Sequence, residues 1–325
     1  MMNTTFKNKL HSLLLPSLLF TLLFTSCSSD DADVILPVPT ISEVEIGLGN
    51  NEIGVVGRDF HFNAEILAGD KIDLVTIQFR QRSEETYSEA WSYEIIWDDY
   101  KGVKNATVHK HFDIPMDAIE GNYDLVITIS DENGTLLEEV RNVTIYLPEH
   151  LPVDPQLLEF TVAARSDSYR VLYIHSLGGY RDPETLEYGN YNVYIDKGET
   201  LDASVNLGGL KDDGVVYMLL INKKNQHKPE SISSIDFSKV VVIDVFEHTA
   251  LEQTERWSNI HYERPNFPDI SRLLVGASVD NNMPTPSPIS DLKAWESGTY
   301  YVGFIYKNTT HNIELFQYME LSLNF

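Results

Sequence analysis

The sequence is poor in residues that support thiol chemistry. Cys27 is the only cysteine among 325 residues. A single cysteine excludes an internal disulfide and a zinc site built from several cysteines. The rest of the chain offers no thiolate nucleophile.

Positive charge is scarce as well. The chain has 24 lysine and arginine residues against 49 aspartate and glutamate residues, a formal net charge of −25. Loss of residues 1–26, which contain two lysines and no acidic residue, would leave 22 basic residues and a net charge of −27. We therefore expect no nucleic-acid partner, whereas metal cations and basic proteins are electrostatically favoured. Solubility at a crowded cell surface explains the same charge equally simply.

Recognisable catalytic motifs are missing too. The sequence contains no Gly-x-Ser-x-Gly elbow, no His-Glu-x-x-His pair and no phosphate-binding glycine loop. Residues 131–134 offer too few oxygen ligands for a calcium loop and predict a hairpin turn instead. We therefore assign no catalytic residue and predict that the protein is not an enzyme.

The amino terminus carries an export pattern. Two lysines precede an apolar run over residues 13–24, and Cys27 follows two small residues. The run is too short to cross about 30 Å of hydrocarbon, so residues 1–26 are predicted to be a signal peptide. The pattern resembles the bacterial lipobox, although Phe24 replaces the usual leucine. That resemblance implies lipidation of Cys27 and attachment to a membrane.

A polar, acidic stretch follows the cysteine. Residues 28–33 contain three aspartates and no large apolar side chain, so residues 27–36 are predicted to be a flexible tether. The stretch resembles the acidic export signal of Bacteroidota-type lipoproteins. It implies an outer-membrane location, lipid-anchored and facing the cell exterior.

Proline marks a boundary near the middle of the chain. Three prolines fall within residues 147–155, so a linker is predicted over 149–156. Before it, strand-like runs separated by turn signals lie at about 41–46, 57–67, 71–81, 91–97, 104–114, 122–130 and 138–147. Seven strands at this spacing predict an immunoglobulin-like β-sandwich over residues 37–148. Tyr123 occupies the position of a tyrosine corner, although an ordinary strand tyrosine is the alternative.

The second half repeats this plan. Residues 199–221 parallel residues 60–79, and the segment from Gly298 parallels the segment from Gly121. The offset grows from about 140 to about 177 residues, which predicts an insertion of roughly 35 residues within about 222–295. The predicted fold is therefore all-β, with two tandem immunoglobulin-like sandwiches, the second over residues 157–325.

Histidines give the first half a candidate metal site. His109 and His111 share one face of the predicted strand 104–114, because side chains alternate along a strand. His61 lies on the predicted strand 57–67, which should be its sheet neighbour. Three imidazoles on one exposed face suit zinc or copper, with Glu65 and Asp113 as possible further ligands. A solvated face without metal is the alternative.

Four segments of the first half carry a family resemblance. They are residues 57–66, 100–105, 109–115 and 121–134. Over about residues 37–148 the chain resembles an uncharacterised family of Bacteroidota-type lipoprotein domains. Membership implies an immunoglobulin-like or cadherin-like fold and no established activity.

Two binding functions fit these observations. One is a surface binding or scaffold lipoprotein with a transition metal at His61, His109 and His111, working with an outer-membrane transporter or a surface protein. The other is a glycan-binding or protein-binding accessory of a nutrient-uptake assembly. Its candidate residues are the aromatic side chains Trp257, Tyr262 and Trp295, which could stack on sugars or belong to the core.

Overall fold

The protein is all-β, as predicted. The computed structural model describes residues 35–260 and 270–325, so Cys27, the signal segment and most of the tether lie outside the described residues. Within the described residues there are strands and short 3-10 turns, and no helix is long and apolar enough to cross a bilayer. Val38–Phe325 forms one compact unit.

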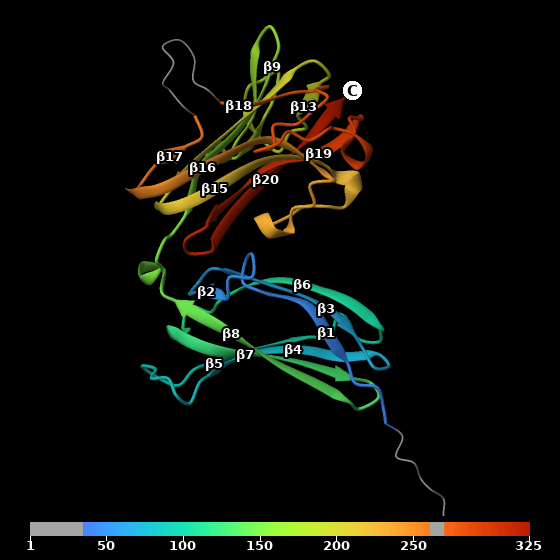
Figure 1. The fold of residues 1–325 in the computed structure, drawn as a ribbon, viewed down its shortest axis with the longest axis vertical. Helices are drawn as coiled ribbons and strands as arrows, with labels where there is room; N and C mark the ends of the chain where they lie inside the picture. Colours follow the sequence, from blue (N-terminus) through green and yellow to red (C-terminus); the bar gives the residue numbers. More distant parts are fainter. Residues whose placement is uncertain (1–34, 261–269) are drawn as a thin grey trace, which may run out of the picture. The chain divides into compact units, whose positions relative to one another are not determined.

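The first sandwich consists of two sheets around one core (Figure 1). One sheet contains β1 (Thr40–Ile46), β3 (Asp59–Leu67) and β6 (Asn105–Asp113), in that order. The other has the order β2 (Ile53–Val55), β8 (Leu136–Tyr146), β7 (Gly121–Asp131), β4 (Ile72–Gln81) and β5 (Ser92–Trp97). Alternation buries Phe60 and Phe62 of β3 against Ile77 and Phe79 of β4. Each predicted strand of this half is present, and β2 is an addition.

The second sandwich repeats the first. Its five-stranded sheet has the order β13 (Tyr194–Asp196), β20 (Ile313–Asn324), β19 (Gly298–Asn308), β15 (Leu210–Asn222) and β16 (Val240–Thr254). As in the first sandwich, a short edge strand pairs in parallel with the last strand, since β2 pairs with β8 and β13 with β20. The other sheet contains β12 (Tyr188–Gly189), β11 (Gly179–Arg181), β10 (Tyr169–Ile174), β9 (Gln156–Arg165), β14 (Thr200–Gly208), β17 (Trp257–Ser258) and β18 (Ser271–Leu274).

A tyrosine corner occurs at the same point of both sandwiches. The Tyr123 hydroxyl donates to the Ile119 carbonyl at 2.7 Å, and the Tyr300 hydroxyl donates to the Glu296 carbonyl at 3.1 Å. In each case the bond reaches back four residues to the chain before the strand. The predicted role of Tyr123 is confirmed, and the correspondence supports the repeat.

Within the range of the predicted insertion, residues 223–239 form a loop between β15 and β16, which we call the 223–239 loop. Leu219 and Ile221 of β15 face away from the main core and form a separate apolar cluster with Ile305 of β19. Ile235 of the loop completes this cluster. The sheet is thus apolar on both faces, and the loop covers the second face.

Candidate metal centre

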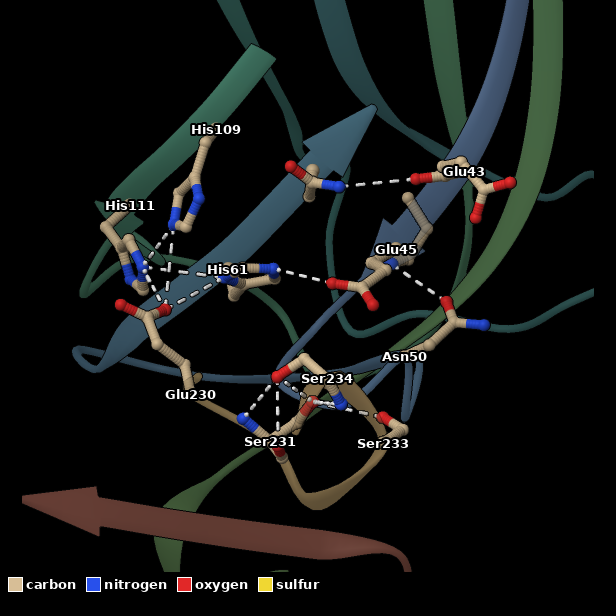
Figure 2. Close-up of polar contacts among 12 residues, drawn as sticks. Glu43, Glu45, Asn50, His61, His109, His111, Glu230, Ser231, Ser233 and Ser234 are labelled. Carbon is tan, nitrogen blue, oxygen red and sulfur yellow. Dashed lines mark hydrogen bonds and ion pairs between the residues drawn. The ribbon is translucent and has the colours of Figure 1, made fainter. Parts of the chain in front are cut away.

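The pairing of β3 with β6 brings the three histidines together. His61 is the register partner of His111, and Asn63 is the register partner of His109. Because side chains alternate along a strand, all three imidazoles lie on the face opposite Phe60 and Phe62. Figure 2 shows the three rings pointing toward one another.

A fourth donor comes from the 223–239 loop. Glu230 Oε2 lies 2.9 Å from His111 Nε2, 3.5 Å from His61 Nδ1 and 3.6 Å from His109 Nε2 (Figure 2). The Glu230 side chain is 19% exposed. One donor atom from each of the four residues lies within 4.8 Å of the other three.

Five separations between these donor atoms, from 2.9 to 3.6 Å, lie close to those of a tetrahedral ion site. His111 Nε2 is 3.4 Å from His61 Nδ1 and 3.3 Å from His109 Nε2. Zinc–nitrogen and zinc–oxygen bonds of about 2.0–2.2 Å in a tetrahedron place the ligand atoms about 3.3–3.6 Å apart. The side chains need little movement to surround an ion of that size.

A single hydrogen on His111 Nε2 cannot serve all the contacts around that atom. His111 Nε2 has three neighbours within 3.4 Å: two imidazole nitrogens and one carboxylate oxygen. A ring nitrogen carries at most one hydrogen, so it can satisfy only one of these contacts as a donor. A shared cation at the centre would satisfy all four donor atoms together.

Two carboxylates orient the histidine rings from outside. His111 Nδ1 contacts Asp59 Oδ2 at 2.7 Å, and His61 Nε2 contacts Glu45 Oε2 at 3.2 Å. In each ring the nitrogen that faces the carboxylate is not the one that faces the cluster. Metal-binding histidines usually hydrogen-bond through their second nitrogen in this way, which fixes the tautomer and the ring orientation.

The pKa values of three residues in the cluster are shifted by burial and by the charges beside them. Burial lowers the pKa of His61, but the carboxylates of Glu230 and Glu45 outweigh it and raise that pKa to about 9. Burial raises the pKa of Glu230, yet the three imidazoles hold it at about 2. The pKa of His109 is lowered, chiefly by burial. Glu230 is therefore an anion at neutral pH and brings a negative charge to the cluster.

Four details differ from the sequence expectation. His61 is buried, with 5% of its side chain exposed, because Glu45, Glu230 and the two other imidazoles surround its ring. Glu65 accepts a hydrogen bond from Thr107 and does not join the cluster. Asp113 is also outside it. The carboxylate that joins the three histidines is instead Glu230, which the sequence analysis missed.

The aromatic residues of the alternative binding site are only partly described. Trp257 and Trp295 are partly buried and pack against the core of the second sandwich. The Trp295 indole nitrogen donates to the Ala277 carbonyl at 2.8 Å, and its ring stacks on Phe325. Tyr262 lies outside the described residues. The described rings therefore have structural contacts.

Comparison with known families identifies the first part of the chain. Residues 25–146 match the family model of a domain of unknown function, DUF4625. The expected resemblance to an uncharacterised family is thereby confirmed. The matched range includes β1 to β8 and the three histidines, and ends before Glu230.

Other comparisons add little. A search of the curated proteins finds no match. Among solved structures, the crystal structure of dimeric latent PorU from Porphyromonas gingivalis is similar at 9% identity and a TM-score of 0.22. The similarity covers 88% of this chain and 24% of that chain. This chain therefore spans about a quarter of that protein.

Proposed function

We propose that this protein is a lipid-anchored surface protein that binds a transition-metal ion through His61, His109, His111 and Glu230. The observation that supports it most is the convergence of four donor atoms at separations close to those of a tetrahedral site. The carboxylates of Asp59 and Glu45 add the outer hydrogen bonds that such sites use.

The donor set favours zinc over copper. Three imidazole nitrogens and one carboxylate oxygen include no sulfur, which copper(I) prefers, and copper(II) prefers a square-planar or tetragonal arrangement. Zinc accepts a tetrahedron of nitrogen and oxygen ligands. A cavity of about 310 Å³ that His61, His109 and Glu230 help to line gives an ion a route to the site.

The proposed role is binding rather than catalysis. Catalytic zinc sites keep one position open for water or substrate, whereas structural sites use four protein ligands. Four protein donors converge here, which supports a site that holds its ion. Lipid attachment through Cys27 and an exterior-facing outer-membrane location remain part of the proposal and derive from the amino-terminal sequence. The acidic surface would favour cation capture.

Titration calorimetry with zinc and copper tests the proposal. The protein is the soluble fragment of residues 34–325, and the control is a His109→Ala, His111→Ala double variant. We expect zinc to bind the parent with a dissociation constant of about micromolar or below, and binding to vanish in the double variant. Equal, weak heats from both proteins would contradict the proposal.

A further inference from the structure

The four donor atoms of the candidate metal centre come from two sandwiches. His61, His109 and His111 belong to β3 and β6 of the first sandwich, whereas Glu230 belongs to the 223–239 loop of the second. An ion bound by all four would therefore connect β3 and β6 to the 223–239 loop. Glu230 is 119 residues from His111 in the sequence.

The loop is fastened to its own sandwich on both sides of Glu230. Before it, the Pro229 carbonyl accepts a hydrogen bond from the Tyr318 hydroxyl of β20 at 2.6 Å. After it, the Ile232 amide donates to Glu314 Oε2 of β20 at 2.8 Å. Glu314 is itself held by Lys307 of β19 at 2.9 Å. The backbone on both sides of Glu230 is therefore held in place by β20 of the second sandwich.

The first sandwich also approaches this region at one turn. A Cβ atom added to Gly49 would lie 2.5 Å from Glu314 Oε1 and 3.4 Å from Ser231 Cβ. The backbone of Gly49 has φ +64°, in the left-handed region that favours glycine. The turn before β2 thus lies against β20 and the 223–239 loop. The candidate metal centre is a second contact between the first sandwich and the same loop.

We propose that the ion acts as a clamp that joins the 223–239 loop of the second sandwich to the histidine face of the first. The clamp rests on the proposed metal-binding function and adds a consequence to it. An ion that gains a ligand only when the two sandwiches meet must stabilise that contact, and the contact must strengthen ion binding by the same factor.

Hydrogen exchange measured by mass spectrometry tests the clamp on the full-length chain in mild detergent, with zinc at saturation or with a chelator. We expect zinc to slow exchange of residues 226–231 by about tenfold. The same slowing should occur in Glu65→Gln, whose carboxylate lies on β3 of the first sandwich, accepts a hydrogen bond from Thr107 and is outside the cluster. In Glu230→Gln, zinc should slow exchange in β3 and β6 and leave residues 226–231 unchanged.

The outcomes separate the two proposals. Zinc binding in the unmodified chain without slower exchange at residues 226–231 would overturn the clamp and leave metal binding intact. Equal slowing of that segment in Glu230→Gln would also overturn the clamp, since the connection would not pass through this carboxylate. Absence of zinc binding in the unmodified chain would overturn both. If a variant folds poorly, the difference in exchange at residues 226–231 between zinc and chelator in the unmodified chain still tests the clamp.

Discussion

At the scale of single residues, Asp59 should matter for affinity although it is not a ligand. Its carboxylate contacts the outer nitrogen of His111 at 2.7 Å. Removal of such an outer-shell carboxylate typically weakens metal binding, so Asp59→Asn should raise the zinc dissociation constant about 10–100-fold. Calorimetry against Asp113→Asn is the matched comparison, because Asp113 is the register partner of Asp59 but lies outside the cluster. Equal affinities in the two variants would contradict the role of Asp59.

Proton release gives a second test at this scale. The pKa of His61 is raised from 6.5 to about 9, so its ring is protonated in the metal-free protein at pH 7.5. An ion at Nδ1 requires a lone pair there, while Nε2 keeps its hydrogen toward Glu45. Zinc binding at pH 7.5 should therefore release about one proton from His61, and the release should fade above pH 9.

Calorimetry in several buffers measures this release. The observed heat should change in proportion to the ionisation enthalpy of the buffer at pH 7.5, and the slope gives the number of protons. A heat that is the same in all buffers at pH 7.5 would show that His61 does not lose a proton to the ion.

The sequence identified the three histidines but not their partner. The period of two along a strand places His109 and His111 together, and the expected pairing of two strands places His61 beside them, as β3 and β6 do. Glu230 had no comparable signal. It is one of 49 acidic residues, and its position depends on how the 223–239 loop packs on β20.

At the scale of elements, the two tyrosine corners should contribute to stability in the same way. Tyr123→Phe removes a 2.7 Å hydrogen bond from a fully buried side chain, and Tyr300→Phe removes its counterpart in the second sandwich. Each change should lower the free energy of unfolding by about 1–2 kcal/mol, since a carbonyl loses its donor. Urea denaturation measures both.

A strand tyrosine outside the corners is the control. Tyr146 is partly exposed, and its hydroxyl makes no hydrogen bond to any residue that the structure describes. Tyr146→Phe should therefore change the free energy of unfolding by no more than about 0.5 kcal/mol. A cost as large as that of Tyr123→Phe would show that the corner bond is not the cause.

Element prediction succeeded where strands are long and alternate. The strand that contains Tyr123 and the hairpin that follows it were predicted from the period of two and from turn chemistry. The short edge strands were not predicted. β2 has three residues and β12 has two, which are too few to show an alternating pattern. The changed offset between the repeats predicted an insertion, but it held no information on which face of the sheet the 223–239 loop covers.

At the scale of the whole molecule, zinc should raise the thermal stability of the unit Val38–Phe325. An ion that binds the folded protein alone stabilises it by about 2.7 kcal/mol when its free concentration is 100 times the dissociation constant. Differential scanning calorimetry should therefore show a higher unfolding temperature with zinc, and a chelator should reverse the change. The His109→Ala, His111→Ala variant should show no shift.

The form of the unfolding transition also carries information. Because the proposed ligands come from both sandwiches, zinc should raise the unfolding temperature of each sandwich, or of their joint transition if they unfold together. An ion held by the three histidines alone would stabilise only the first sandwich. A shift confined to part of the heat absorption would therefore mean that Glu230 is not a ligand in solution, even though the histidines bind metal.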